Sequence, residues 1–365
     1  MPTSTFDTLR HLARMPFLSR LALATLLVTT WLESGVVDTA IHHPSPATHA
    51  LTFAVMGDLP YTFWQRAMFG RFIEALSTDA ALQFAIHLGD IKMGDTPCSD
   101  AYYHSIRTAF NRYEGALMYT PGDNEWTDCH EGAQPRHPVE RLGALRRIFF
   151  HPPGQSLGRR PRQVQTQVQE SHGLRTGLVE NQAWTATGIV FGLLHVPGSN
   201  NGLAPWTPGV GDRSEQMREF ATRLAADLAW LQTLFALAAE REAAALVLGM
   251  QADMWDVSEP PERLEGYTLI VQTLARLAIA YDRPVLLLQG DSHDFLIDKP
   301  LLNGDPLHGV QTPVPGLTRV VVQGGGAHLL LEYLRVTINI DNDPPFLFER
   351  VVPSVFMYMH QFAFR

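Results

Sequence analysis

Short runs of apolar residues recur along the chain, separated by longer stretches with helical spacing. Each run holds aliphatic and β-branched residues with few polar interruptions, a pattern typical of strands that are buried on both faces. The runs predict strands at 51–56, 82–88, 117–120, 189–196, 245–248 and 285–288. A sheet built from such strands needs helices to cover it.

Several of the intervening stretches repeat apolar residues every three or four positions, which predicts amphipathic helices. The clearest begins at Asp212, with Glu215 three residues later as in a capping box. Its apolar stripe consists of Met217, Phe220, Leu224, Leu228, Leu231 and Phe235. A second stripe leads into the strand at 285–288 and consists of Leu264, Tyr267, Ile270, Leu274, Leu277 and Tyr281.

The C-terminal part of the chain is richer in strands. Runs at 318–323, 334–340 and 346–351 predict three more, with a turn at 341–344 between the last two. Alternating strands and helices followed by this strand-rich tail predict an α/β fold with a mixed sheet. The segment at about 128–183 is rich in proline and arginine and lacks a regular pattern, so we expect an insertion that wraps over the core.

The composition is that of a folded domain of substantial size. The chain has 365 residues, of which 45% are hydrophobic and 18% charged, and this balance excludes a generally disordered protein. A chain of this length buries a sizeable core without crosslinks. The formal charge of −9 has the wrong sign for binding nucleic acid in bulk. A basic pocket within one cleft is still compatible with it.

The first 34 residues have the pattern of a secretory signal. Arg10, Arg14 and Arg20 precede an apolar run at 21–32, which is too short to cross a bilayer. We expect 1–34 to direct export to the periplasm or the medium, either as a cleaved signal or as an uncleaved anchor that makes the only membrane contact. A buried N-terminal helix is the alternative. Residues 35–50 then form a linker before the domain at 51–365.

The sequence contains two cysteines, Cys98 and Cys129. In an exported protein such a pair most simply forms a disulfide, because the compartment is oxidising. Two free buried thiols are the alternative.

Four predicted strands end in the dipeptide Gly-Asp, which places Asp58, Asp90, Asp123 and Asp291 at strand ends. In open α/β sheets, ligands bind beyond the carboxyl ends of the strands. Carboxylates gathered there would repel one another and lose hydration unless cations neutralise them. With His293 two residues after Asp291, the set suits a divalent metal ion such as Mn²⁺, Mg²⁺, Ca²⁺, Fe or Zn²⁺.

Five short blocks carry a resemblance to a known family. They are Asp58, Gly89-Asp90, Gly122-Asp123-Asn124-Glu125, Gly249-Met250-Gln251 and Gly290-Asp291-Ser292-His293. Their order is similar to the signature of the calcineurin-like metallophosphoesterases, the superfamily that includes the purple acid phosphatases, over residues 51–326. The resemblance implies two mixed β-sheets packed face to face and flanked by helices, a four-layer sandwich with two divalent metal ions at the strand ends.

The resemblance also implies a role for each matching position. Asp90 would bridge the two ions. Asp58 and His293 fall on the first ion. The positions near the second ion are Asp123, Gln251 and Asp291.

The chain departs from the family pattern where the family supplies nitrogen ligands. Pro60 and Met93 stand where a His or Tyr usually completes the first metal site. Asp123 replaces an Asn and Asp291 replaces a His, while Gln251, or Met250 beside it, stands where another His is expected. An oxygen-rich set favours harder ions, which predicts Mn²⁺ or Mg²⁺ over Zn²⁺.

The predicted site leaves open which group supplies a proton to the leaving group. Asn124 stands where the family has a proton-donating His, and an amide cannot donate a proton to an alkoxide. Glu125, His195 or a water on the metal could replace it, or a good leaving group would need none. His195 closes the strand at 189–196 and is otherwise a structural residue.

Three further residues are candidates for substrate contact. Lys92 follows Asp90 closely and could pair with a phosphate or with a neighbouring carboxylate. Asn200 and Asn201 lie in a small polar loop that either binds the substrate or is a plain turn.

We therefore expect an exported enzyme that hydrolyses phosphate mono- or diesters of small molecules with two divalent metal ions. The alternative is a pseudoenzyme of the same fold that binds a phosphorylated ligand or a partner. A purely structural secreted domain is disfavoured because uncompensated carboxylates at strand ends contribute nothing to packing.

Overall fold

The fold is described from a computed structural model, which covers residues 50–171, 174–325 and 330–354. Residues 1–49, which include the predicted signal segment and almost all of the predicted linker, lie outside them. Within the covered ranges, no helix is both long and apolar enough to cross a membrane.

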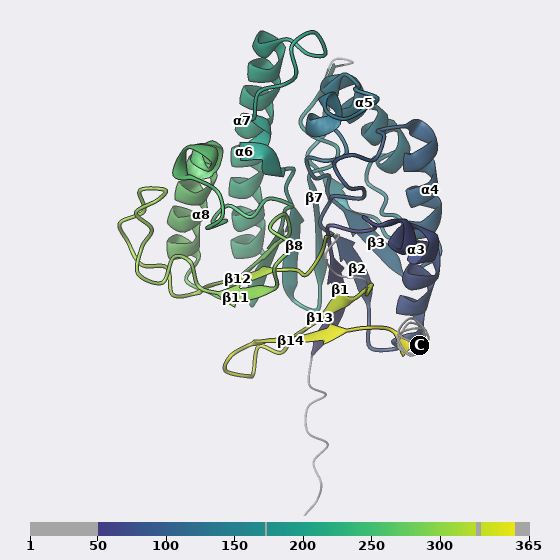
Figure 1. The fold of residues 1–365 in the computed structure, drawn as a ribbon. Helices are drawn as coiled ribbons and strands as arrows, with labels where there is room; N and C mark the ends of the chain where they lie inside the picture. The colour runs from purple at the N-terminus through teal and green to yellow at the C-terminus, as the bar shows by residue number, and fades with distance from the viewer. Residues whose placement is uncertain (1–49, 172–173, 326–329, 355–365) are drawn as a thin grey trace, which may run out of the picture. The chain divides into compact units, whose positions relative to one another are not determined.

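Two mixed β-sheets form the centre of the molecule (Figure 1). The first has five strands in the order β14-β13-β1-β2-β3, and the second has seven in the order β11-β12-β10-β9-β8-β7-β4. The strands of the first sheet are β1 (Leu51–Met56), β2 (Phe84–His87), β3 (Ala116–Tyr119), β13 (Tyr333–Ile338) and β14 (Phe346–Val351). Those of the second are β4 (Gln165–Thr166), β7 (Gln182–Ala186), β8 (Ile189–Leu193), β9 (Ala245–Gly249), β10 (Val285–Gln289), β11 (Leu296–Asp298) and β12 (Leu317–Val321). A separate hairpin consists of β5 (Gln169–Ser171) and β6 (Leu174–Thr176).

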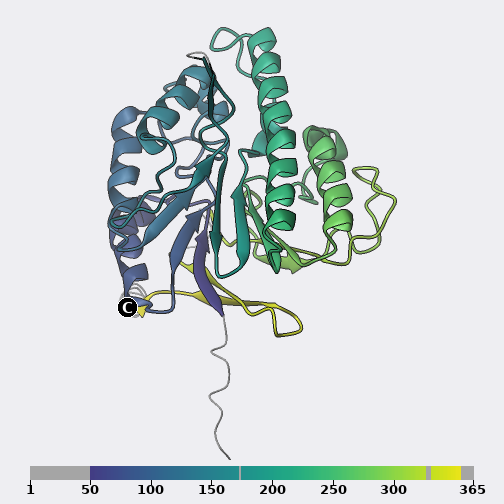
Figure 2. The ribbon, with the colours of Figure 1, turned by 180° about the vertical axis from the view of Figure 1, so that it is seen from behind.

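Helices cover the outer face of each sheet, which completes four layers (Figure 2). The first sheet is covered by α3 (Phe63–Ala75), α4 (Asp100–Phe110) and α5 (Pro138–Phe149), and the second by α7 (Arg213–Glu240) and α8 (Thr268–Tyr281). The shorter helical segments are α6 (Gly198–Gly202), η1 (Leu76–Thr78), η2 (Thr127–His130), η3 (Pro261–Arg263) and η4 (Glu265–Tyr267). The predicted face-to-face α/β sandwich is confirmed.

The inner faces of the two sheets meet in an apolar core. Phe53 and Phe84 stack from the first sheet with ring centroids 5.1 Å apart, and Phe191 packs edge-on against both from the second sheet. Trp184 stacks on Phe191 at 5.2 Å. Because the strands contribute apolar side chains to the core and to the helix layers alike, their sequences read as continuous apolar runs.

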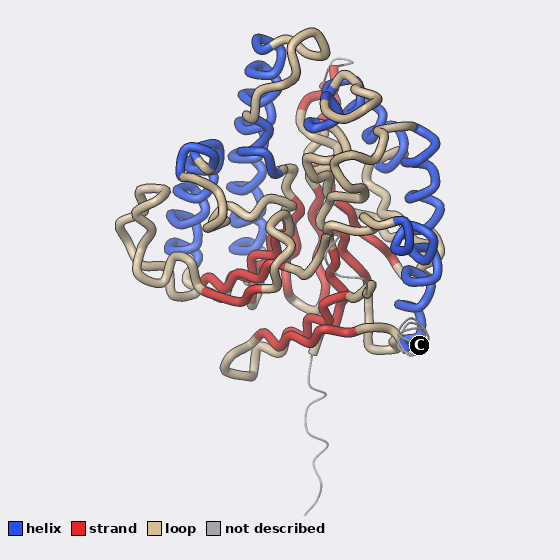
Figure 3. Tube along the Cα trace, in the orientation of Figure 1, coloured by secondary structure: helices blue, strands red, loops and turns tan. Residues whose placement is uncertain are grey.

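All of the predicted strands are present, with ends that shift by a few residues (Figure 3). The segment at 128–183 contains η2, α5 and the short strands β4, β5 and β6. Helices α3 and α4, in contrast, are not among the elements that the apolar pattern predicts.

Helix α7 differs from its prediction along its first half. Asp212 caps the helix by accepting a hydrogen bond from the Ser214 N–H, but Glu215 pairs with His137 at 3.1 Å and does not complete a capping box. Met217, expected in the apolar stripe, is exposed. The buried face of this half carries Gln216, Arg223 and Asp227, which is possible because each of these side chains hydrogen-bonds to a neighbouring residue.

Parallel pairing brings the functional loops to one edge of the sandwich. Strands β1, β2 and β3 run parallel, and so do β8, β9 and β10. The carboxyl ends of parallel strands lie at the same edge of a sheet. A hydrogen bond of 3.0 Å from the Asp291 N–H to Asp58 Oδ1 joins this edge of the two sheets.

Candidate metal centre

The backbone turns sharply where several of the strands end. Asp58, Asp90, Asp291 and His293 have positive φ angles of 55°, 55°, 75° and 65°. This left-handed conformation is disfavoured by roughly 1–2 kcal/mol for each residue that carries a Cβ. Its recurrence in one place means that the surrounding contacts hold these residues in a fixed orientation, as is common at functional sites.

The glycines of the Gly-Asp dipeptides make room for carboxylates from other loops. A Cβ on Gly122 would collide with the Asp90 carboxylate, and a Cβ on Gly290 would collide with that of Asp58. Each of these glycines therefore serves an aspartate in a different block. The recurring dipeptide reflects close packing between loops as well as the chemistry of the aspartates.

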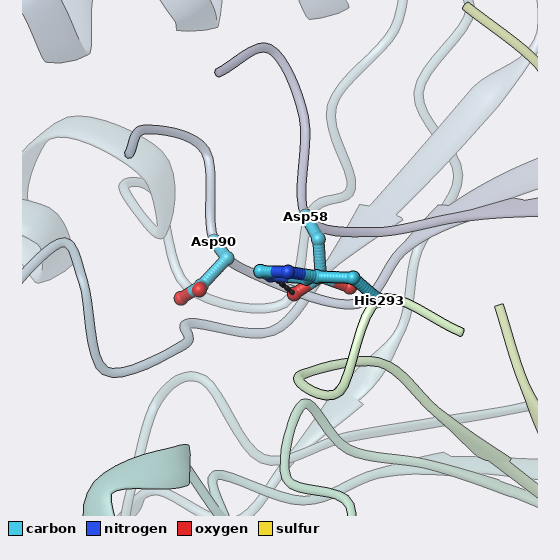
Figure 4. Close-up of side chains that lie close together, drawn as sticks. All are labelled: Asp58, Asp90 and His293. Carbon is cyan, nitrogen blue, oxygen red and sulfur yellow. Dashed lines mark ion pairs between the residues drawn. The ribbon is translucent and has the colours of Figure 1, made fainter. Parts of the chain in front are cut away.

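Asp58, Asp90 and His293 form what we call the histidine half of the centre. One ligand atom from each lies within 4.8 Å of the other two, and Figure 4 shows the three side chains meeting from three separate loops. His293 Nε2 is 3.7 Å from Asp58 Oδ1. Among the described His, Cys, Asp and Glu residues, this is the one group that gathers three ligand atoms so closely.

The histidine half is short of positive charge. Burial and the nearby charges of Asp123 and Glu125 raise the pKa values of Asp58 and Asp90 well above the usual value for aspartate. Asp58 Oδ2 is buried and has no hydrogen-bond partner within the described part of the chain. Two carboxylates, one of which has an unpaired buried oxygen, and one imidazole fit a divalent cation.

Tyr61 also belongs to this half, and the sequence analysis missed it. Its hydroxyl donates to Asp90 Oδ2 at 2.6 Å and lies 3.3 Å from His293 Nε2. The matching of family positions pointed to Pro60 and Met93 instead. Tyr61 immediately follows Pro60, so a search for phenols anywhere in the loop after Asp58 would have found it.

Asp123, Gln251 and Asp291 form what we call the glutamine half. Gln251 Nε2 donates to Asp291 Oδ1 at 3.0 Å and to Asp123 Oδ1 at 3.4 Å, while Gln251 Oε1 accepts from the Gly198 N–H. Burial and the charges of Asp123 and Asp58 raise the pKa of Asp291. The three side chains thus lie together as expected, but an amide NH₂ group faces the carboxylates.

Asp128 lies beside the glutamine half and was also missed. It accepts a hydrogen bond of 2.7 Å from the Ser199 hydroxyl. Burial and the neighbouring Asp123 raise its pKa. Asp128 does not belong to a Gly-Asp dipeptide at the end of a strand, so no motif in the sequence marked it as a site residue.

Glu125 is fully buried and supports the loops through one carboxylate oxygen, whereas its Oε2 atom has no hydrogen-bond partner among the described residues. Its Oε1 atom accepts hydrogen bonds from the N–H groups of Asp90 and Gly122, at 3.1 and 2.8 Å, and from the Tyr119 hydroxyl at 2.8 Å. Asn124 donates through Nδ2 to Asp90 Oδ2 and to the Tyr61 hydroxyl. Asn124 therefore touches the histidine half, whereas Glu125 holds the backbone beneath it.

Lys92 and the disulfide also stabilise the loops that carry the site residues. Lys92 is buried, and its ammonium group donates to the carbonyl of Asn124 at 2.7 Å and to that of Gly94 at 3.3 Å. Burial lowers its pKa, although the carboxylates of Glu125 and Asp90 oppose this. Cys98 and Cys129 form the predicted disulfide, which links the segments after β2 and β3.

His195 lies in a separate buried group that we call the α7 network. The network consists of Arg146, Glu180, His195, Arg223 and Asp227. His195 Nδ1 is 2.8 Å from Glu180 Oε1, and Glu180 also accepts from Arg146 Nη2 at 2.6 Å. Burial lowers the pKa of His195 despite the neighbouring Glu180. The ring packs against Trp126, with centroids 5.3 Å apart.

Asn200 and Asn201 lie in a left-handed turn whose side chains bond to the protein. Ser199, Asn200 and Asn201 all have positive φ angles. Asn200 Oδ1 accepts from the Gly266 N–H at 2.8 Å, and Asn201 Nδ2 donates to the Gly266 carbonyl at 3.0 Å. Arg223 Nη2 donates to the Asn201 carbonyl at 2.8 Å. These amides therefore hold the turn in place.

Comparison with known proteins finds similarity in structure. No family model and no curated protein matches the sequence. Among solved structures, GAP50, the anchor in the inner membrane complex of Plasmodium, is 9% identical with a TM-score of 0.48 and covers 84% of this chain and 85% of its own. The purple acid phosphatase PPD1 from yellow lupin seeds is 13% identical with a TM-score of 0.45, covering 84% of this chain and 52% of its own.

A third similar structure is TT1561 of Thermus thermophilus, at 10% identity and a TM-score of 0.41, which covers 84% of this chain and its whole own length. This chain spans about half the length of the lupin phosphatase. These likenesses concern the fold, and we take the function from the geometry of the site.

Proposed function

We propose that this chain is an exported, metal-dependent phosphoesterase that hydrolyses phosphate mono- or diesters of small molecules. The observation that carries the proposal is the histidine half, where two buried carboxylates and an imidazole present ligand atoms within 4.8 Å of one another. One of these carboxylates, that of Asp58, also has a buried oxygen with no hydrogen-bond partner in the described part of the chain.

The charge around the histidine half supports a resident cation. The carboxyl groups of Asp58, Asp90 and Asp291 lie close enough to influence one another or to be influenced by further carboxyl groups, namely those of Asp123, Glu125 and Asp253. At an effective dielectric constant of about 20, two like charges about 4 Å apart repel by about 4 kcal/mol. Lys92 offsets part of this charge from below. A divalent ion at Asp58, Asp90 and His293 would offset the rest.

Divalent ions held at this centre, of which the resemblance implies two, would supply an activated water and offset the charge of a phosphoryl group during displacement. Asp58, Asp90 and His293 would hold the first ion, and Asp123, Gln251 and Asp291 are the residues available for a second. Asn124 and Tyr61 orient the Asp90 carboxylate through their hydrogen bonds. The role of the chain's own residues is thus to bind the metal ions and to orient the side chains that hold them.

The centre lacks an obvious side chain to protonate a leaving group, which favours esters whose leaving group is stable without a proton. Burial and the charges of Asp90 and Asp58 raise the pKa of Tyr61 well above 10, so its phenol donates hydrogen bonds but is a weak acid. Asn124 carries no acidic proton. His195 and Glu125 are fully buried, with His195 Nδ1 paired to Glu180 and Glu125 Oε1 accepting from backbone N–H groups, so neither side chain is exposed to a substrate. We therefore expect aryl esters, whose leaving group needs no proton, to be the better substrates.

Export is part of the proposal. The disulfide between Cys98 and Cys129 supports it, because disulfides persist in oxidising compartments. The pattern at 1–34 supplies the targeting signal, followed by the linker at 35–50 and the domain at 51–365. Mass spectrometry of the exported protein would show whether this segment is removed or stays as a membrane anchor.

Turnover of an aryl phosphate and an aryl phosphodiester, measured with Mn²⁺, Mg²⁺, Zn²⁺, Ca²⁺ and Fe²⁺, tests the proposal. Asp90→Asn is expected to lower kcat/KM by more than about 100-fold, beyond the 10- to 100-fold typical of residues that only orient metal ligands. Asp341→Asn, at an exposed position in a turn, is the matched control and should leave kcat/KM unchanged. A folded chain that turns over neither ester with any of these ions contradicts the proposal.

The second candidate is a pseudoenzyme that binds a phosphorylated ligand or partner. It is favoured by one observation, namely that Asn124, at the expected position of the proton donor, is engaged with Asp90 and Tyr61. Binding of a non-hydrolysable phosphonate without any turnover would select this candidate.

A further inference from the structure

We infer that this centre holds one divalent ion per chain, at Asp58, Asp90 and His293, and that the amide of Gln251 takes the place of a second ion between Asp123 and Asp291. The inference rests on the proposed function and narrows it, since the resemblance implies two ions. The glutamine half fails as a cation site for reasons that concern its own hydrogen bonds.

The orientation of the Gln251 amide is fixed by the backbone of Gly198. A backbone N–H can only donate, so the atom that it meets must be the amide oxygen, Gln251 Oε1. The NH₂ group then faces the two carboxylates, at 3.0 Å from Asp291 Oδ1 and 3.4 Å from Asp123 Oδ1. A flipped amide would place two donors against each other. Gln251 therefore offers hydrogen atoms where a cation needs an oxygen.

The carboxylates of the glutamine half already have donors. Asp291 accepts from Gln251 through Oδ1 and from the Asp253 N–H through Oδ2, at 3.3 Å. Asp123 Oδ1 accepts from the Asn124 N–H at 3.0 Å. Hydrogen bonds to a carboxylate stabilise its charged form without a metal. In the histidine half, Asp90 also accepts hydrogen bonds, from Tyr61 and Asn124, but Asp58 Oδ2 is buried without a donor among the described residues.

Two buried arginines hold the loops on either side of Gln251. Arg223 donates to the Asn201 carbonyl and lies over the Trp126 ring, 5.4 Å from its centroid. This fixes the turn that begins at Gly198.

On the other side, Arg319 pairs with Asp253 at 2.6 Å and lies 5.2 Å from the centroid of Trp255. Asp253 also accepts from the Ser292 hydroxyl at 2.8 Å. Because the loops on both sides of Gln251 are fixed, they cannot move to compensate for a rotated amide. Turning Gln251 Oε1 toward a second ion would leave the buried Gly198 N–H without an acceptor.

Binding of Mn²⁺ to the chelator-stripped full chain tests the inference without relying on turnover. Equilibrium dialysis with metal analysis gives the stoichiometry, and electron paramagnetic resonance distinguishes an isolated Mn²⁺ from an exchange-coupled pair. We expect one Mn²⁺ per chain with the six-line signal of an isolated ion. Two ions per chain would overturn the inference and leave the proposed function standing, whereas no bound ion would overturn both.

Single substitutions then locate the ion. Asp58→Asn is expected to weaken Mn²⁺ binding at least 100-fold, whereas Asp291→Asn should change the Kd less than threefold. Loss of the ion in a folded Asp291→Asn variant, checked by circular dichroism, would overturn the assignment.

Gln251→Glu is the most specific test. It keeps an acceptor for Gly198 and replaces the NH₂ group by an oxygen, so a second Mn²⁺ and a coupled signal are expected. Gln289→Glu, a buried change at the end of β10 whose amide bonds to the Ala252 carbonyl, is the matched control and should still bind one ion. An unchanged stoichiometry in folded Gln251→Glu would show that the amide does not exclude the second ion, and would overturn the inference.

Discussion

The histidine half of the metal centre and the α7 network both bury charged side chains, but they balance them differently. In the α7 network, Glu180 meets Arg146 and His195, and Arg223 lies near Asp227. In the histidine half, Asp58 and Asp90 meet further carboxylates. The comparison shows that buried charge alone does not mark a ligand site. An unpaired buried oxygen occurs in both regions, on Asp58 and on Asp227, so the local excess of negative charge around Asp58 and Asp90 is the more specific sign of a missing cation.

Removing a partner from the α7 network should have the largest effect on stability. Glu180→Ala leaves Arg146 and His195 without their acceptor, and breaking a buried pair in this way costs about 3–5 kcal/mol. Urea denaturation of wild type and variant measures the loss. Glu259→Ala breaks an exposed pair with Arg263 and serves as the control, at about 0–1 kcal/mol. Equal losses in the two variants would mean that the network is not a balanced ion cluster.

Adding Mn²⁺ should stabilise the metal centre and not the α7 network. At a free concentration of 100 times the Kd, binding to the folded state alone adds about 2.7 kcal/mol to the free energy of unfolding. Thermal shift measurements should find this gain in the wild type and in Asp227→Asn, but not in Asp58→Asn. A gain that survives in Asp58→Asn would place the ion elsewhere.

Buried carboxyl groups with raised pKa values in both regions make stability depend on pH, and a substitution can isolate the part that comes from the α7 network. Burial raises the pKa of Asp227 to about 8, against an ordinary value of 3.8. The folded state therefore holds a proton that the unfolded state releases, so stability falls as the pH rises from about 4 to about 8, at about 1.4 kcal/mol per unit.

Asp227→Asn, which mimics the protonated acid, should make the stability curve less steep by about 1.4 kcal/mol per pH unit in urea denaturation at pH 5 to 8, while the slope from Asp58 and Asp90 remains. Asp282→Asn at an exposed helix end is the control and should keep the wild-type slope. An unchanged slope in Asp227→Asn would show that the carboxyl is already ionised within the network.

The smallest expected effect concerns the orientation of Asp90. Tyr61→Phe removes one hydrogen bond to Asp90 Oδ2, which should weaken Mn²⁺ binding about 2- to 10-fold, or roughly 0.5–1.5 kcal/mol. Calorimetric titration measures the change. Tyr102→Phe removes a bond of similar length to the Ile91 carbonyl and should leave the Kd near wild type. Equal effects in both would mean that Tyr61 acts only through packing.

The sequence predicts the sheets better than the helices because the strands are apolar on both faces. Helix α5 is not predicted because it lies in a proline-rich segment. Its own proline, Pro138, occupies a first-turn position that proline favours. Helix α7 is predicted, but its buried face is not predicted correctly. Arg223 and Asp227 lie on that face and interrupt its apolar repeat. Whether a polar side chain is buried depends on partners from distant segments, such as Asn181 for Asp227, and the local pattern does not contain them.

The site follows the same rule. Gly-Asp dipeptides at strand ends are visible in the sequence, and parallel pairing makes their convergence predictable. Tyr61 reaches the site from the loop after β1, and Asp128 reaches it from η2. No hydrophobic repeat in the sequence predicts either position. The orientation of the Gln251 amide depends on one N–H group, that of Gly198, more than fifty positions away in the chain.

The glycines that admit the carboxylates of other blocks tie distant positions to one another. Gly122 makes room for Asp90, and Gly290 makes room for Asp58. In descendants of this chain, an alanine at Gly290 should appear only together with a smaller residue in place of Asp58, whereas at Gly122 the backbone nitrogen of Asp90 also blocks a Cβ. Such paired replacement would identify, from sequences alone, lineages that have abandoned the centre while keeping the fold.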